Sequence, residues 1–258
     1  MQQVLISLGA FGAAEVRRHG QQWFSQLAHE AGADGVEVRG ELLRDASSEL
    51  PAIARVARER SLALVYSSPE GVWQADGKLD TAALDRALDA ARQLGAPRLK
   101  MSIGGFGRDS AGSFAALAQA VRAAGVELVI ENDQTVAAGT IAPLQTFFTQ
   151  ANAAGVRLGM TFDMGNWHWT GECPLEAAHS FADRVAYVHC KGVQRQPHRW
   201  VAVPLADSAA PWRTILRAMP RSVPWAIEYP LQGDDLVAVT REQVRSLREI
   251  AATLGAAK

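Results

Sequence analysis

Apolar residues in this chain gather in eight short runs of strand length. The stretches between them are rich in alanine, leucine and arginine and repeat apolar positions with the period of a helix, as in residues 81–94. Alternating strands and helices are typical of a parallel sheet built from βα units. The predicted strands are Val4–Ser7, Gly35–Arg39, Leu62–Ser67, Arg98–Ile103, Glu127–Glu131, Leu158–Asp163, Val185–His189 and Pro224–Glu228.

Eight strands in 258 residues suit a closed barrel. Helical candidates include Thr81–Leu94 and Arg241–Leu254. Several helical stretches end at a glycine where a left-handed cap is needed, namely Gly32, Gly95, Gly125 and Gly155. No linker or low-complexity segment marks a domain boundary. We therefore predict an α/β protein that forms a single (β/α)8 TIM barrel, with residues 1–258 as one domain.

Charge and composition narrow the expected partners. The formal net charge is -1 and the basic residues are scattered, which argues against a nucleic-acid surface. No run approaches the ~20 apolar residues that a membrane helix requires. Two cysteines, Cys173 and Cys190, are too few for a disulfide framework. We expect no signal peptide, because the apolar start MQQVLISLGAFG shows neither a basic leader nor a cleavage site. We expect a cytoplasmic protein that acts on a small molecule, without nucleic-acid or membrane partners; a homodimer fits barrels of this kind.

Four candidate metal ligands stand at the ends of the last four predicted strands. They are Glu131, Asp163, His189 and Glu228. The loops after barrel strands form one mouth, so side chains at these ends should converge there. Three carboxylates and one imidazole suit a divalent cation; Mn²⁺ is preferred here, and Mg²⁺, Co²⁺ or Zn²⁺ is also compatible.

Alternation along the strands predicts further side chains in the mouth. Lys191 shares a face with His189, and Asp133 shares one with Glu131. Lys100 and Lys191, beside the candidate metal ligands, would suit an anionic or keto-acid substrate. For each lysine, an ion pair with a nearby carboxylate is the alternative. Glu37 could contact substrate or pair with Arg39 inside the barrel. The candidate substrate-binding residues are Lys100, Lys191, Asn166 and Glu37.

The same residue types indicate proton transfer at carbon. A divalent cation could stabilise the oxyanion of an enediolate, and a carboxylate bound through one oxygen could act as a base through the other. Glu131 and Glu228 are the candidate acid/base pair. If they lie on opposite faces of the substrate they would invert a stereocentre. A single carboxylate that both removes and returns the proton would make the enzyme an isomerase.

Four phrases of the sequence resemble the xylose-isomerase-like TIM-barrel superfamily, in its sugar epimerase and isomerase branch. They are IEN around Glu131, FDMGNWHWTGECP from Phe162, YVHCKGV around His189 and AIEYPLQG around Glu228. The resemblance covers nearly the whole chain. It implies that these strand ends bind metal and that the two glutamates are the acid and base.

The chain departs from the ketose 3-epimerases of that family at two places. These enzymes have a substrate-binding histidine three residues after the metal aspartate, where this chain has Asn166. Their substrate-contacting arginine beyond the metal histidine has no clear counterpart, because the phrase continues as Lys191-Gly192. The epimerase-like protein of 2-ketogluconate utilisation is therefore the preferred resemblance, and a keto sugar or keto sugar acid the expected substrate.

Two alternatives fit the same residues. A sugar-acid dehydratase would expel a β-hydroxyl from the same enediolate instead of reprotonating it. A non-catalytic sugar-binding barrel could keep the fold, but pure binding does not need two carboxylates on a metal. An abasic-site endonuclease shares the family fold yet uses a richer histidine set, and six histidines mostly outside the strand ends argue against it.

Overall fold

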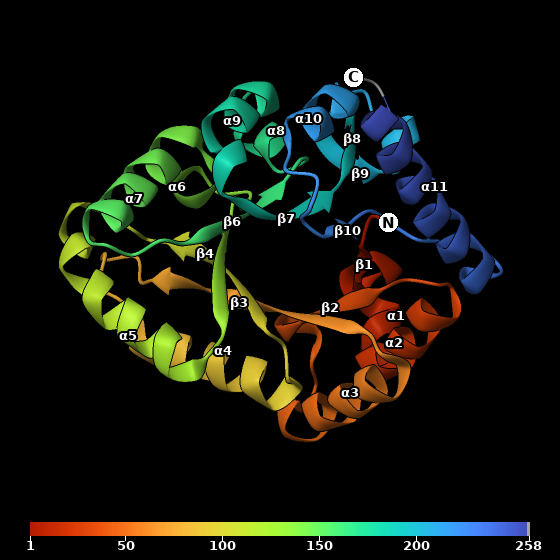
Figure 1. The fold of residues 1–258 in the computed structure, drawn as a ribbon, viewed down its shortest axis with the longest axis horizontal. Coiled ribbons are helices and arrows are strands. Elements are labelled where there is room, and N and C mark those ends of the chain that lie inside the picture. The colour runs from red at the N-terminus through yellow and green to blue at the C-terminus, as the bar shows by residue number, and fades with distance from the viewer. Residues whose placement is uncertain (257–258) are drawn as a thin grey trace.

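The computed structural model describes residues 1–256 and contains the predicted closed barrel. Eight parallel strands form it in the order β1-β10-β7-β6-β5-β4-β3-β2 (Figure 1). The chain is thus a (β/α)8 TIM barrel, as predicted. The barrel strands are β1 Val4–Ser7, β2 Gly35–Arg39, β3 Ala63–Trp73, β4 Arg98–Gly104, β5 Glu127–Glu131, β6 Gly159–Asp163, β7 Val185–Cys190 and β10 Trp225–Ile227.

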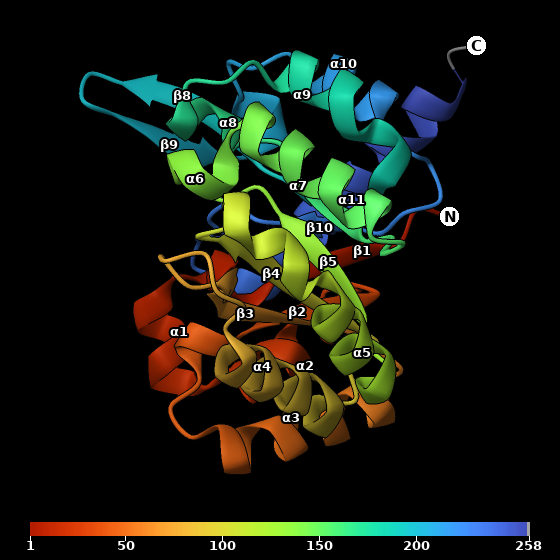
Figure 2. The same cartoon turned by 90° about the vertical axis from the view of Figure 1, so that its left-hand side faces the viewer.

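Helices surround the strands in both views (Figures 1 and 2). None of the helices within residues 1–256 is long and apolar enough to cross a bilayer. The α-helices are α1 Ala13–His19, α2 Gln21–Glu30, α3 Ala46–Arg60, α4 Thr81–Leu94, α5 Phe114–Ala124, α6 Val136–Gly139, α7 Ile141–Ala153, α8 Trp167–Thr170, α9 Pro174–Phe181, α10 Trp212–Ala218 and α11 Leu236–Ala256. Short 3-10 helices are η1 Leu8–Phe11, η2 Gly40–Leu42, η3 Arg108–Ser113, η4 Ala182–Arg184 and η5 Leu205–Asp207.

Helix α4 shows how the sequence produces these elements. The Asp80 side chain accepts a hydrogen bond from the Ala83 backbone N–H at 2.9 Å and so caps the start of the helix. At its other end Gly95 has φ +73°, a left-handed conformation that glycine adopts without strain. The apolar stripe between them is buried, and it includes Leu84 and Leu88. The other three predicted cap glycines also have positive φ.

Inside the barrel, the end opposite the mouth is closed by side chains. The Arg98 guanidinium pairs with the Glu127 carboxylate at 2.8 Å at the first residues of β4 and β5. Above this pair the lumen holds a small buried apolar cluster, and the Arg98 guanidinium lies over the ring of its one aromatic residue, Tyr187. Side chains therefore fill the lumen at the end opposite the strand ends that carry Glu131 and Asp163. The cluster consists of Leu5, Val65, Tyr187 and Ala226.

Two features of the sheet were not predicted. Strand β3 continues to Trp73 through a bulge, whereas the prediction stopped at Ser67 because Pro69 and its polar neighbours interrupt the apolar pattern. After β7 the chain forms an antiparallel hairpin of β8 Gly192–Gln196 and β9 Arg199–Val203. Figure 2 shows this hairpin projecting from the body of the barrel. It begins directly after Lys191, so it stands beside the mouth.

Candidate metal centre

The barrel brings the four predicted metal ligands together. Glu131, Asp163 and His189 lie on β5, β6 and β7, and Glu228 comes directly after β10. Each offers one ligand atom, and these atoms all lie within 4.8 Å of one another. His189 Nδ1 is 3.0 Å from Glu131 Oε1, 2.8 Å from Glu228 Oε2 and 3.6 Å from Asp163 Oδ2.

This spacing and this donor set fit a divalent cation. Metal–oxygen bonds of about 2.1 Å at right angles place neighbouring donors about 3 Å apart. The contacts of His189 Nδ1 are of that size. Three carboxylates and one imidazole are hard or borderline donors, and no thiolate takes part because the Cys190 thiol is not in the group. The positions and donor types of the four residues thus fit a divalent metal ion.

Local hydrogen bonds fix the direction of the Asp163 carboxylate. Its Oδ1 accepts the backbone N–H groups of Gly165 and Asn166 at 2.8 and 2.9 Å, so Oδ2 is left to face the other ligands. Asn132 ties β5 to β6, because its side chain donates to the Asp163 carbonyl at 3.0 Å and accepts from the Asp163 N–H at 2.9 Å. Two neighbouring strand ends are therefore held in register at the site.

Glu37 orients the imidazole of His189. Glu37 Oε2 lies 2.7 Å from His189 Nε2, and both side chains are fully buried. In the neutral imidazole, a proton on Nε2 donated to this carboxylate would leave the lone pair of Nδ1 toward the other ligands. Carboxylates behind a metal-binding histidine have this effect in many proteins.

Replacing Glu37 tests this arrangement. We expect Glu37→Gln to weaken Mn²⁺ binding by about 10–100-fold, because the neutral amide no longer stabilises the orientation and basicity of His189. Isothermal titration calorimetry with Mn²⁺ measures the affinity of the two proteins. Glu127→Gln, at the closed end of the barrel, is the control. Equal Mn²⁺ affinity in Glu37→Gln and the original protein would contradict the role of Glu37 in orienting His189.

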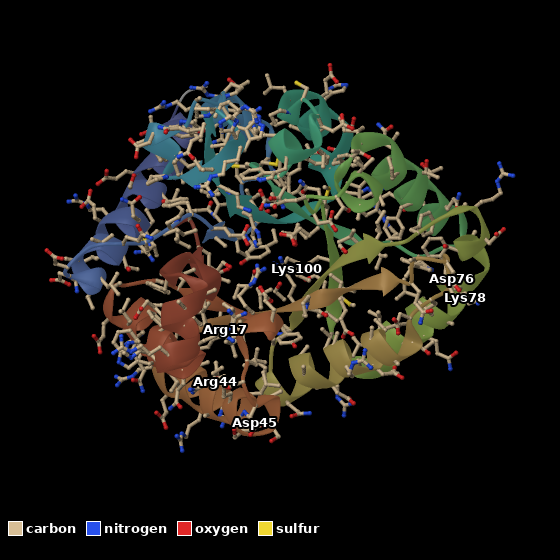
Figure 3. The ribbon with its side chains drawn as sticks, turned by 180° about the vertical axis from the view of Figure 1, so that it is seen from behind. Arg17, Arg44, Asp45, Asp76, Lys78 and Lys100 are labelled. Atoms are coloured by element: carbon tan, nitrogen blue, oxygen red, sulfur yellow. The ribbon has the colours of Figure 1, made fainter. Side chains whose placement is uncertain are left out.

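Two buried lysines lie against the ligand carboxylates. Lys100 Nζ is 2.5 Å from Glu131 Oε2 and 3.6 Å from Glu37 Oε1. Figure 3 shows Lys100 near the middle of the barrel. Lys191 Nζ lies 2.7 Å from Asp163 Oδ2 and 2.8 Å from Glu228 Oε2. Both ammonium groups therefore already have carboxylate partners.

Lys191 also joins the substrate candidate Asn166 to the site. Lys191 Nζ donates to Asn166 Oδ1 at 3.0 Å, and the Asn166 side-chain amide donates to the Asn132 carbonyl at 2.9 Å. Asn166 is buried. It thus holds both the loop after β6 and the end of the Lys191 side chain.

Arg39 is a site residue that the sequence placed only in a structural pair. Its Nη1 lies 3.0 Å from Glu37 Oε1 and 2.9 Å from Glu228 Oε1, and its Nε lies 2.9 Å from Glu41 Oε1. Gln21 holds its backbone through two hydrogen bonds of 2.8 Å. The two oxygens of Glu228 therefore have different neighbours, Arg39 on one side and the ligand group on the other. The signal was available, because Glu37 and Arg39 are two apart on one strand.

Positive charges in the site hold the carboxylates of Glu131 and Glu228 ionised. Burial by itself raises the pKa of Glu228, but the positive charges of His189 and Lys191 lower it well below its usual range. Burial likewise raises the pKa of Glu131, and the ammonium group of Lys100 outweighs it, so this pKa is lowered. Asp163 differs, because burial leaves its pKa raised despite the nearby Lys191. The two candidate acid/base residues are thus carboxylates at neutral pH.

A cavity of about 440 Å³ opens beside Glu228. Its wall includes Arg39, Lys191, Ala202 of β9 and Arg17 of α1. Of the four residues predicted to contact substrate, only Lys191 lines it. Asn166 lies behind Lys191, while Lys100 and Glu37 lie behind Glu131 and His189.

Asp133 does not join the ligand group, although alternation had placed it on the face of Glu131. Strand β5 ends at Glu131, and the pleat is lost after it. The Asp133 carboxylate instead accepts hydrogen bonds from the backbone N–H and hydroxyl of Thr135, both at 2.7 Å. Asp133 therefore stabilises the turn before α6.

Comparison with solved structures shows the same fold along nearly the whole chain. A xylose isomerase domain containing protein from Salmonella typhimurium LT2 superposes with a TM-score of 0.72, at 13% identity over 97% of each chain. An L-ribulose 3-epimerase gives 0.71, at 18% identity over 98% of this chain and 96% of that one. The probable 3-DHS dehydratase of petrobactin synthesis from Bacillus anthracis gives 0.67, at 12% identity over 96% and 99%.

A search of curated protein sequences gave no significant match. A family model does match, and it spans residues 25–250, which includes all four members of the metal-binding group. Its description is xylose isomerase-like TIM barrel. On that match the chain belongs to the xylose isomerase-like TIM barrel family.

Proposed function

We propose that the protein is a divalent-metal-dependent epimerase or isomerase of a keto sugar or keto sugar acid. One observation carries the proposal. Glu131 and Glu228 each turn one oxygen toward His189 Nδ1 and the other toward a cation, Lys100 for Glu131 and Arg39 for Glu228. Each carboxylate can therefore help to hold a metal and still offer a second oxygen for proton transfer.

The roles of the two glutamates depend on their surroundings. A divalent cation held by Glu131, Asp163, His189 and Glu228 would supply Lewis-acid stabilisation to negative charge on the substrate's oxygens. Glu228 lines the cavity, so we assign to its Oε1 the removal of a proton from the substrate carbon. In an epimerase, Glu131 would first take up a proton from solvent and then give it to the opposite face of the carbon, while Glu228 would later release to solvent the proton it removed.

The four expected substrate contacts divide into two groups. Lys191 lines the cavity and Asn166 holds its ammonium group, so we propose that this pair meets the substrate near the reacting carbon. Lys100 and Glu37 are buried behind the ligands. For these two we propose positioning roles, Lys100 on Glu131 and Glu37 on His189.

Further expectations belong to the proposal. Mn²⁺ is the proposed metal, because the donor set is mostly carboxylate with one imidazole. We propose a cytoplasmic enzyme that works as one domain, with a homodimer as the assembly to test. Cys190 is a buried thiol and Cys173 an exposed one, and neither forms a disulfide within the described chain, which fits a reducing compartment.

Solved structures of similar fold support this reaction class without identifying the reaction. They include D-psicose 3-epimerase from Clostridium cellulolyticum H10, L-ribulose 3-epimerase and a 3-keto-D-glucoside 4-epimerase from E. coli. The probable dehydratase from Bacillus anthracis keeps a lyase as the second candidate. In that case removal of the proton by Glu228 would be followed by loss of the β-hydroxyl, which would leave as water with the proton that Glu228 took up.

Deuterium exchange tests the proposal. We expect deuterium from D₂O to enter one carbon-bound position of a keto sugar or 2-keto sugar acid when Mn²⁺ is present. NMR measures the exchange and identifies the product, which separates an epimer, an isomer and a dehydration product. Chelation of the metal should abolish the signal. Binding of metal and sugar without exchange for any compound tested would favour a sugar-binding barrel.

A further inference from the structure

The cavity beside Glu228 reaches the metal-binding group only through that residue. Its wall is formed by the segment after β1, by α1, by η2, by β9 and by the segment after β10. Glu131, Asp163 and His189 do not line it. A substrate whose reacting carbon lies at Glu228 can extend its remaining atoms along this wall, which reaches Arg17 on α1.

Three cationic side chains line this cavity, and two of them are already paired. Arg39 contacts Glu37, Glu41 and Glu228 within 3.0 Å. The Lys191 ammonium group contacts two carboxylates within 2.8 Å.

Arg17 differs from the other two cations. No carboxylate within residues 1–256 lies in ion-pair distance of its guanidinium, and its nearest polar contact is the Glu41 backbone carbonyl at 3.5 Å. Arg39 contacts both Glu228 and Glu41, so Arg17 stands one contact farther from the reacting end of the cavity. Its charge is available to a ligand.

Arg17 lies on helix α1, which has few buried contacts with the rest of the protein. The helix has seven residues, and Val16 is its one buried side chain. Gly12 and Gly20 flank it with φ of +86° and +83°, so the chain turns sharply at both ends. Figure 3 shows Arg17 among the N-terminal helices, and Figure 1 places α1 beside β1 and β2. Small movements of α1 would adjust the guanidinium to a ligand.

We propose that Arg17 binds an anionic group, a carboxylate or a phosphate, at the end of the substrate away from the reacting carbon. The proposal rests on the proposed function and narrows its substrate class to acidic sugars. A guanidinium offers two parallel N–H donors to either anion, which gives both affinity and orientation. It also explains how the enzyme would recognise an acid although Lys100 and Lys191 are already paired.

Binding of unreactive probes tests the proposal without requiring turnover. Calorimetric titration of the Mn²⁺-loaded protein would compare D-gluconate, D-glucitol 6-phosphate and D-glucitol, which share a six-carbon polyol chain. We expect at least one of the two anions to bind more tightly than D-glucitol. Arg17→Gln should lower the affinity for the favoured anion by about tenfold, a typical effect of losing a charged hydrogen-bonded pair. The anion that loses more affinity identifies the carboxylate or the phosphate.

Matched variants complete the test. Arg18→Gln removes the same charge from the neighbouring exposed position of α1, outside the cavity, and should leave anion binding unchanged. Arg17→Lys keeps the charge but not the two parallel donors, so it should recover only part of the affinity lost in Arg17→Gln. Equal anion binding in Arg17→Gln and the original protein, or no preference for either anion over D-glucitol, would overturn the proposal. Absence of deuterium exchange with intact anion binding would instead count against the proposed reaction alone.

Discussion

Glu228→Gln should lower the rate of substrate proton exchange by about 10²–10⁴-fold, the usual contribution of a general base. The amide keeps the size of the side chain and one oxygen acceptor. It cannot accept a proton from carbon, and its single oxygen cannot face both Arg39 and the ligand group as the carboxylate does. Deuterium wash-in measured by NMR at saturating Mn²⁺ gives the rate.

A control variant separates loss of the base from a general loss of charge in the barrel. Glu127→Gln also removes a carboxylate that pairs with an arginine, but at the closed end of the lumen. It should exchange protons at the original rate. If Glu228→Gln bound Mn²⁺ normally and still exchanged protons at the original rate, another group would be the base.

The companion variant Glu131→Gln shows how the two carboxylates share the reaction. In a two-base epimerase each variant loses exchange from one epimer and keeps part of it from the other. In a one-base isomerase Glu131→Gln keeps exchange from the substrate on which Glu228 acts. The pattern thus reports whether the two glutamates stand on opposite faces of the bound sugar.

Lys100→Met should lower the free energy of unfolding of the metal-free protein by about 3–5 kcal/mol, the usual cost of removing one partner from a buried ion pair. Lys100 is 1% exposed, and its ammonium group lies between Glu131 and Glu37. Burial by itself lowers the pKa of Lys100, but these carboxylates raise it, so the group is charged at neutral pH. Urea unfolding monitored by circular dichroism measures the change.

An exposed lysine provides the comparison. Lys78 pairs with Asp76 at 2.8 Å, and Figure 3 shows this pair at the periphery of the molecule. Lys78→Met should leave the unfolding transition unchanged, because exposed ion pairs are weak. Saturating Mn²⁺ should restore part of the stability lost in Lys100→Met, since the cation also neutralises Glu131. Equal stability of the two variants would show that Lys100 does not balance the buried carboxylates.

The barrel and the ligand group were predictable because their signals are local. Each strand is a short apolar run that ends at a break, and the side chains at the ends of parallel barrel strands gather at one mouth. The prediction for β5, Glu127–Glu131, matches the structure at both ends. The four ligands converge although up to 97 residues separate them in the chain.

The less predictable features depend on contacts between distant segments. The hairpin of β8 and β9 has weak apolar alternation, and its strands pair only with each other. The contact of the Arg39 guanidinium with Glu228 joins residues that are 189 positions apart, which no local pattern specifies. Asp133 was misplaced because alternation holds only while the strand continues, and β5 stops at Glu131.

Apart from Glu228, which belongs to both, the residues of the cavity wall differ from those that would hold the metal. The ligands stand at strand ends that the whole barrel stabilises. Part of the wall, Ala13 and Arg17 of α1 and Ala202 of β9, belongs to elements that add little to the core. Mutations in these peripheral elements can therefore accumulate without loss of the fold. Over evolutionary time a lineage could move from one sugar to another by rebuilding a seven-residue helix and one hairpin. A laboratory library restricted to the same segments would explore that path directly.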